Sequence, residues 1–222
     1  VDRLSHGRLD LGVAPGGGRR KFEAFGVDPK TFISSFTEGL ELMKAAWSDE
    51  PRVTFHGRFR DVDDLPISPK PVQRPHPPIW FGANAPPRAI ARAVRHGDAF
   101  MGAGSSTTEN FATAVQTVRA ELAEQEKDPH TFRIGKRVYL IVDDDDARAR
   151  ERVLSGLRRI YGSMPGVDAV PVSGTVSDVV RGLREVIDAG AQTLLLHPVG
   201  ASLAEDREQM ERLAAEVIPQ LS

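Results

Sequence analysis

Short apolar runs alternate along this chain with longer stretches in which apolar residues recur every three or four positions. The short runs are bounded by turn residues and predict buried strands, whereas the helical spacing predicts a helix after each strand. Strands are expected at residues 8–13, 79–81, 99–101, 137–142 and 193–196. This alternation is typical of parallel α/β proteins, and the pattern alone leaves a barrel and a doubly wound sheet both open.

The helices are predicted from apolar stripes and from residues that suit helix ends. They are expected over residues 33–47, 86–96, 109–127, 146–161, 178–189 and 203–218. Capping-box spacing places Ser106 and Ser202 at two helix starts, and Ser177 or Asp178 begins a third. In the last helix the stripe predicts that Leu203 and Met210 belong to the inward face. Residues 164–173 are expected to form a loop.

Residues 48–78 interrupt the alternation of strand and helix. Residues 53–55 and 58–60 flank His56 and Gly57, which predicts a β-hairpin. From Pro66 to Pro78 the chain carries six prolines, which favour an extended, polyproline-like segment. We interpret residues 48–78 as an insertion within one domain spanning residues 1–222, because a new strand begins directly after the prolines and the length suits one domain.

Small residues follow two consecutive predicted strands, at 82–85 and at 102–104, and each group precedes a helix. Parallel strands joined by a helix place both loops at the same edge of the sheet. Helix N-termini present free N–H groups and a positive dipole end, which attract anions. The sequence therefore predicts a phosphate site at this edge, against the alternative that the glycines serve only as turns.

A third small-residue loop, residues 14–18, follows the first predicted strand and contains three glycines. It could cradle a phosphate or act only as a turn. No Walker motif and no G-x-G-x-x-G fingerprint occurs here. The following cations, Arg19, Arg20 and Lys21, suit either an anion contact or, as we favour, a solvated charge run.

Composition excludes several classes of protein. The 29 basic and 31 acidic side chains form no basic stripe, which argues against a nucleic-acid partner. There is no cysteine for a disulfide or a thiolate metal site. No apolar run approaches the roughly 20 residues that span a bilayer, and no signal peptide is apparent, so we expect a cytoplasmic protein without a membrane partner. The acidic run Asp143–Asp146 suits a metal site or a helix start, and its spacing favours the helix start.

Four blocks of this sequence resemble the luciferase-like monooxygenase superfamily, the flavin- or deazaflavin-dependent (β/α)8 barrels. The blocks are residues 4–13 with 22–27, the proline-rich 69–80, residues 93–100 and residues 190–198. In those barrels the strand at residues 9–13 would be the fourth. The resemblance thus implies an α/β fold that is an incomplete (β/α)8 TIM barrel, with strands 4 to 8 and their helices. It also implies an N-terminally truncated chain, and the absence of an initial methionine agrees with that expectation.

The resemblance also implies where a cofactor would bind. Its phosphate would lie at the loops after family strands five and six, and Asn84 and Ser105 could donate hydrogen bonds. The loop after strand four would run beside the ring or its tail. The implied cofactor-binding residues are Ala14, Gly16, Gly82, Ala83, Asn84, Ala85, Ala103, Gly104 and Ser105. His197, at the end of the last strand, suits a structural role better than a functional one.

The resemblance implies an oxidoreductase that acts on a small organic substrate. Many flavin-type members carry an arginine near the position of Pro15, where this chain has proline and then glycines, which favours hydride transfer with the deazaflavin F420. The alternatives are an FMNH2-dependent monooxygenase with a flavin reductase partner, or a non-catalytic flavin-binding paralogue. A homodimer is compatible with the family. Neither a metal nor a catalytic acid or base is assigned.

Overall fold

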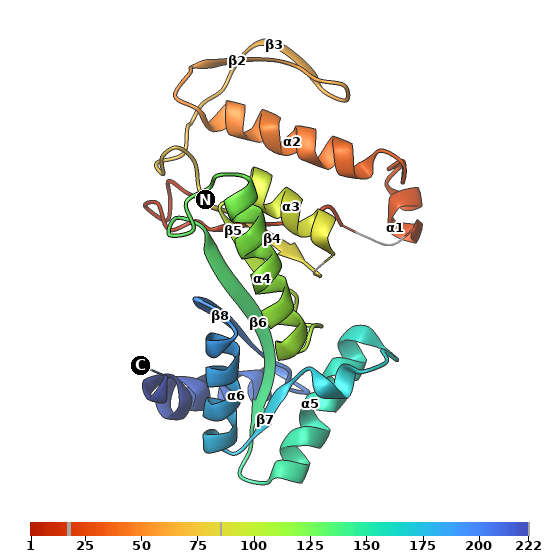
Figure 1. Cartoon of the computed structure of the whole chain (residues 1–222), viewed down its shortest axis with the longest axis vertical. Helices are drawn as coiled ribbons and strands as arrows, with labels where there is room; N and C mark the ends of the chain where they lie inside the picture. Colours follow the sequence, from red (N-terminus) through yellow and green to blue (C-terminus); the bar gives the residue numbers. More distant parts are fainter. Residues whose placement is uncertain (17–18, 85, 222) are drawn as a thin grey trace. The chain divides into compact units, whose positions relative to one another are not determined.

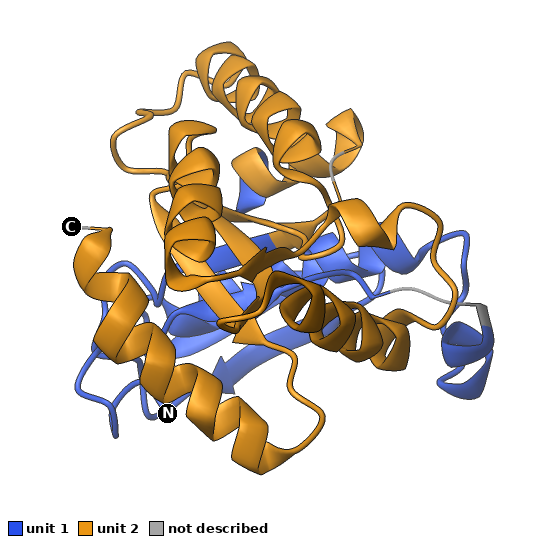
Figure 2. Ribbon diagram, turned by 90° about the horizontal axis from the view of Figure 1, so that it is seen from below, with its two compact units in different colours: residues 1–81, 95–98 blue, residues 82–94, 99–222 orange. Residues whose placement is uncertain are grey.

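The apolar runs form strands that pair in parallel, and helices follow them along the chain. Figure 1 labels most of these strands and helices. The computed structural model describes residues 1–16, 19–84 and 86–221. Two compact units can be distinguished (Figure 2). One comprises Val1–Phe81 with Arg95–Asp98, and the other Gly82–Val94 with Ala99–Ser222. Strand β4 (Ile79–Ala83) and helix α3 (Pro87–His96) contribute residues to both units.

The first unit contains a parallel pair formed by β1 (Leu11–Val13) and the first residues of β4. Leu11 lies opposite Ile79 and Val13 opposite Phe81. The predicted strand at 8–13 is therefore shorter than expected and begins at Leu11. The charge run after it opens a short helix that was not predicted, α1 (Arg19–Ala24), and α2 (Phe32–Trp47) follows as expected.

The predicted hairpin exists, but its second strand was placed too early. Strand β2 (Arg52–His56) pairs antiparallel with β3 (Asp61–Pro66), not with residues 58–60. The carboxylate of Glu38 accepts hydrogen bonds from the backbone N–H groups of residues 58, 59 and 60. These bonds hold the three residues in the turn, so the ladder starts at Asp61. The proline-rich residues after β3 form neither helix nor strand up to β4, as expected.

In the second unit, β6 (Arg133–Val142) is the strand with most partners. It pairs in parallel with β5 (Ala99–Gly102), β7 (Val172–Gly174) and β8 (Thr193–Pro198). Strand β7 was not predicted, because its first residues were assigned to a loop. The strand order is β1-β4-β5-β6-β7, with β8 paired to β6 beside this path. Residues Val138–Val142 of β6 are buried, which places β6 in the core of this unit.

Four helices accompany these strands. They are α4 (Thr108–Glu124), α5 (Asp146–Tyr161), α6 (Val176–Asp188) and α7 (Leu203–Arg212), with a short 3₁₀ turn at Val167–Ala169. After α7 the chain continues through a π-helical turn, Leu213–Val217, and a 3₁₀ turn, Ile218–Gln220. Within the described residues, no helix is both long enough and apolar enough to cross a membrane.

Two predicted helix caps were off by a few residues. Thr107, not Ser106, caps α4, because the Ser106 hydroxyl is already bonded to a backbone carbonyl and to a lysine. Thr175, not Ser177 or Asp178, caps α6, and Asp178 completes a capping box with it. The prediction that Ser202 caps α7 is confirmed.

The predicted inward stripe of the last helix is wrong at its first positions. Leu203 and Met210 are exposed, by 88% and 62%, whereas Gln209 is completely buried. The Gln209 amide donates to the carbonyl of Val142 at 2.9 Å and accepts from its N–H at 2.7 Å. A buried polar side chain thus satisfies the backbone N–H and carbonyl groups of the last residue of β6, where apolar packing was expected.

Candidate functional site

The two predicted phosphate loops lie against each other in the second unit. The N–H of Ala103 donates to the carbonyl of Ala83 at 3.3 Å, and the Ser105 hydroxyl donates to the side-chain oxygen of Asn84 at 3.2 Å. The ends of β4 and β5 therefore form one edge, as the strand–helix–strand pattern predicted. This bond to Ser105 orients the side-chain amide of Asn84, including its NH2 group.

The loop after β5 ends in the cap of a long helix. Thr107 accepts a hydrogen bond from the N–H of Asn110, and α4 begins at the next residue. In the part of the chain that the structure describes, the N–H groups of Gly104 and Ser105 have no hydrogen-bond acceptor. Two free N–H donors at a helix start are well suited to an anion.

Gly104 is buried, and side chains of β6 leave no room for a larger residue at this position. A Cβ atom at this position would lie 2.5 Å from Cε2 of Tyr139 and 2.7 Å from Nε of Arg137. Those separations are far below ordinary contact distances, so a side chain here would displace β6 groups. The missing side chain therefore lets the arginine and the tyrosine lie directly against the loop backbone.

Lys136 is a site residue that the sequence analysis missed. It is 3% exposed, and its ammonium group donates to the carbonyls of Ala103 and Ser106 and, at 2.9 Å, to the Ser106 hydroxyl. Burial, together with the charge of the neighbouring Arg137, lowers the pKa of Lys136 to about 8. Below that pH a positive charge lies directly under the loop. The available signal was a Lys-Arg pair, Lys136 and Arg137, at the start of an apolar strand.

Arg137 was also missed, and it approaches the same loop from the other face of β6, because side chains alternate along a strand. Its guanidinium carbon lies 5.2 Å from the ring centroid of Tyr139. Its Nε atom is buried and has no hydrogen-bond partner. Among the described residues, neither Arg137 nor Lys136 forms an ion pair. The loop thus lies between two cations whose charge no carboxylate of the described chain neutralises.

Aromatic rings extend the site beyond Arg137. The hydroxyls of Tyr139 and Tyr161 are hydrogen-bonded at 2.6 Å, and the His197 ring lies 5.0 Å from the Tyr139 ring. Burial, together with the bond from Tyr161, raises the pKa of Tyr139. Burial and the nearby Arg137 lower the pKa of His197, so its imidazole is neutral at pH 7.

The remaining predicted site residues are placed as follows. Ala14 is exposed and directly follows Val13 of β1, and Gly16 has a left-handed backbone with φ of +79°. Both belong to the first unit. Gly82 is exposed near the end of β4. Ala85 lies outside the described residues, as does Gly17 in the loop after β1.

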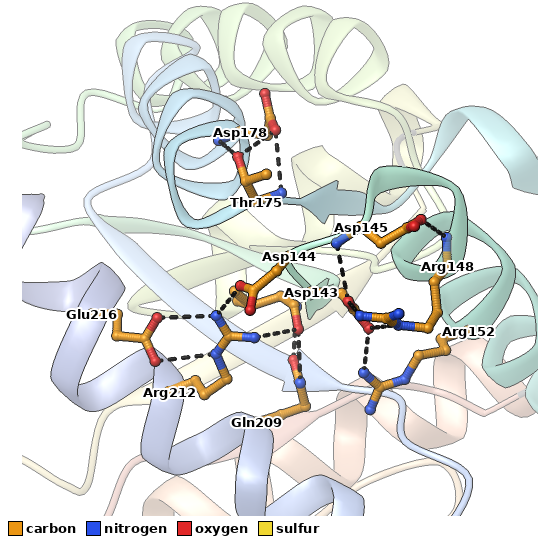
Figure 3. A network of polar contacts seen from close by, with 11 residues as sticks. Asp143, Asp144, Asp145, Arg148, Arg152, Thr175, Asp178, Gln209, Arg212 and Glu216 are labelled. Atoms are coloured by element: carbon orange, nitrogen blue, oxygen red, sulfur yellow. Dashed lines mark hydrogen bonds and ion pairs between the residues drawn. The ribbon is translucent and has the colours of Figure 1, made fainter.

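The acidic run after β6 forms a structural network, shown in Figure 3. Asp145 caps α5 by accepting from the N–H of Arg148 at 2.8 Å, which confirms the predicted helix start. Asp143 is 3% exposed and accepts from the guanidinium groups of Arg148 and, at 2.8 Å, Arg152. The bonds from Arg148 hold the pKa of Asp143 well below its usual range. Among the described residues, no three metal-ligating side chains converge.

Parallel strands that are each followed by a helix, with small-residue loops at their carboxyl ends, define an α/β protein of the barrel class. The model of the luciferase-like monooxygenase family matches residues 1–217, so the chain belongs to that family. The resemblance stated from the sequence is therefore confirmed.

Two curated relatives illustrate the range of this family. The chain is 29% identical over 153 residues to the FMNH(2)-dependent dimethylsulfone monooxygenase of Pseudomonas putida, covering 68% of this chain and 40% of that protein. It is 25% identical over 206 residues to the phthiodiolone/phenolphthiodiolone dimycocerosates ketoreductase of Mycobacterium sp. (strain JLS), covering 90% of this chain and 51% of that protein. The chain thus spans about half, or less, of the length of these relatives.

Solved structures share the fold. Monooxygenase RslO1 from Streptomyces bottropensis matches with a TM-score of 0.84 and 21% identity, over 100% of this chain and 71% of that one. An F420-dependent secondary alcohol dehydrogenase matches with a TM-score of 0.81 and 18% identity, over 99% and 71%. The prediction of a partial (β/α)8 barrel is confirmed. The parallel strands pair in the order β1-β4-β5-β6-β7, with β8 also paired to β6, as in part of such a barrel.

Proposed function

We propose that this chain carries the cofactor-phosphate site of a luciferase-like oxidoreductase, that the cofactor is the deazaflavin F420, and that FMN is the second candidate. The observation that carries the proposal is the loop after β5. It carries two N–H groups that have no acceptor in the described chain, and it lies between Lys136 and Arg137, which have no carboxylate partner among the described residues. An anion is the ligand that such an arrangement favours.

The residues of this edge fit a phosphate group. The N–H groups of Gly104 and Ser105 would donate to phosphate oxygens, and Asn84 would add its amide from the neighbouring loop. The three N–H bonds of Lys136 are already occupied by the loop, so its role would be to hold the loop and to supply charge. Gly82 and Ala83, as small residues, would let the anion approach the end of β4.

The bound cofactor would supply the chemistry: hydride transfer with a small organic substrate for a deazaflavin, or oxygen activation for reduced FMN. The protein's part at this edge is to bind and orient the cofactor. The loop after β1, with Ala14 and Gly16, would lie beside the ring or its tail. No residue is assigned as a catalytic acid or base.

Two features bear on which cofactor binds. Proline and glycines stand near position 15, where many flavin-type family members carry an arginine, and this supports the deazaflavin. The relative from Pseudomonas putida is named as FMNH(2)-dependent, which supports FMN as the second candidate. An FMN enzyme would also need a flavin reductase as its partner, and either enzyme could act as a homodimer.

Titration of the full chain with F420 and with FMN, followed by fluorescence, tests the proposal. Binding of F420 without FMN supports the deazaflavin, and the reverse supports the FMN-dependent monooxygenase. Failure of a folded protein to bind either cofactor would overturn both candidates and favour a non-catalytic paralogue. Circular dichroism establishes that the protein is folded in each case.

The placement of the phosphate is tested by Gly82→Asp. A carboxylate beside the phosphate is expected to weaken cofactor binding by about 100-fold or more, because juxtaposed like charges cost several kcal/mol. The matched control is Ala120→Asp, which adds the same charge to an exposed position far along α4 and should leave the affinity unchanged. Equal affinities of Gly82→Asp and the wild type would refute the placement.

A further inference from the structure

We propose that Arg137 is the side chain that binds the cofactor phosphate, supplied from β6 instead of from the loop after β1. This inference rests on the proposed function and assigns it a specific cation. It starts from a gap in the site: the loop after β1 has no arginine near Pro15, and in the described chain the first cation after that loop is Arg19, at the start of α1.

The position of Arg137 relative to the loop carries the inference. Gly102 of β5 is the register partner of Lys136, so Arg137 follows that pair at the point where β5 ends and the loop begins. Its Nε atom would be 2.7 Å from a Cβ on Gly104. The side chain therefore lies against the same residue whose N–H group is free. A phosphate on that N–H group would lie within reach of the guanidinium.

The hydrogen-bonding state of Arg137 differs from that of Arg152 and Arg212, two other partly buried arginines of the second unit. Arg152 is paired with Asp143, and Arg212 is paired with Asp144 and Glu216. Arg137 has a buried Nε without a hydrogen-bond partner, and among the described residues it forms no ion pair. Leaving a buried donor unsatisfied costs free energy, and a phosphate oxygen would remove that cost.

Lys136 and Arg137 differ in how many hydrogen-bond donors they have left for a ligand. Lys136 uses its donors on the loop, whereas the planar guanidinium of Arg137 retains donors that match phosphate oxygens in a bidentate arrangement. Tyr139 lies under the guanidinium and holds it in place, and the Tyr139 hydroxyl is itself fixed by Tyr161. Arg137 is thus oriented before any ligand arrives, which reduces the entropy lost on binding.

A purely structural role makes a different prediction. If Arg137 served only to pack on Tyr139, its loss would affect all ligands of the site alike. If it binds the phosphate, its loss would affect only ligands that carry one. Pairs of ligands that differ by the phosphate therefore separate the two roles: FMN and riboflavin, or F420 and the same deazaflavin without its phosphate-linked tail.

The experiment compares dissociation constants for the pair that the wild type binds, using the full chain and the variants Arg137→Met and Arg137→Lys. Arg137→Met is expected to weaken binding of the phosphorylated ligand by about 10- to 100-fold, the range for losing hydrogen bonds to a charged group. Binding of the phosphate-free ligand should change by less than about twofold. Arg137→Lys should restore part of the loss, because it restores the charge without the bidentate geometry.

The control is Arg158→Met, which removes an exposed arginine of α5 and should leave both affinities unchanged. If Arg137→Met keeps the wild-type preference for the phosphorylated ligand, the assignment of Arg137 is overturned while the phosphate site stands. If both ligands lose affinity equally, Arg137 acts through packing and the assignment is again overturned. If the wild type itself binds both ligands equally, the phosphate site as a whole is wrong.

Discussion

Strand β6 carries two clusters of charged side chains, one at each end, and only one of them contains both cations and carboxylates. Beyond its carboxyl end, Asp143 is surrounded by Arg148 and Arg152, and the charges satisfy one another. Nearer its start, Lys136 and Arg137 approach the loop after β5, and no carboxylate in the described chain accompanies them. Both clusters are at least partly buried, so solvent does not account for the difference.

The contrast teaches how to separate structural charges from binding charges. A buried ion that has protein partners holds elements together, here the end of β6 and the start of α5 (Figure 3). A buried cation without a carboxylate partner carries a desolvation cost that an anionic ligand would offset. By this criterion the acidic run is structural, and the Lys136–Arg137 pair is the place where we propose that an anion binds.

The largest effect on stability is expected at the compensated cluster. Asp143→Ala leaves two arginines without their buried carboxylate and should lower the free energy of unfolding by about 3 kcal/mol. Urea denaturation measures this change. Because the pKa of Asp143 is lowered in the folded state, its contribution should be present above about pH 4 and be lost as the pH falls further. A loss below about 0.5 kcal/mol would show that the network is not structural.

A smaller effect is expected where the loop meets the uncompensated cluster. Gly104→Ala places a methyl group against Tyr139 and Arg137, and overpacking of this kind costs about 1–3 kcal/mol of stability. Cofactor affinity should fall as well, because Arg137 is displaced. The control Gly12→Ala meets no atom within 4 Å and should be stability-neutral within about 0.5 kcal/mol. Equal melting curves for the two variants would contradict the close approach at Gly104.

The smallest effect is a dependence of affinity on pH that follows from Lys136. Its pKa of about 8 means that its charge is present at pH 7 and is lost as the pH rises. Between about pH 7 and about pH 9, affinity for the phosphorylated cofactor should therefore fall by up to about tenfold. His197, whose pKa is lowered, stays neutral across this range. The phosphate-free ligand serves as the control, and a parallel fall in its affinity would exclude Lys136 as the cause.

Much of this architecture could be predicted from the sequence, because the strands are apolar runs between turn residues. The edge formed by Ala83 and Ala103 followed from the rule that a strand–helix–strand unit aligns its loops. Features set by distant residues could not be predicted. Glu38 of α2 holds the hairpin turn by hydrogen bonds, and Gln209 is buried because its side chain is hydrogen-bonded to the backbone of Val142.

The two cations of the site were missed for a related reason. A lysine and an arginine in a strand suggest positions that face solvent, and only the loop packed against β6 makes them buried. The sequence shows the residues Lys136 and Arg137 but not the absence of a carboxylate around them. Caps were misplaced by smaller margins, since Ser106 had the right spacing but a competing partner.

The central claim is that the backbone N–H groups of Gly104 and Ser105, in the loop after β5 and beside the end of β4, bind the phosphate of the cofactor. Amide ¹H–¹⁵N spectra of the labelled full chain, recorded during titration with a cofactor and with its phosphate-free counterpart, test it most directly. The account predicts that the signals of Gly82–Asn84 and Ala103–Ser105 shift with the phosphorylated ligand and much less with its counterpart. Binding of the phosphorylated cofactor without any shift of the Gly104 and Ser105 amides would contradict the account.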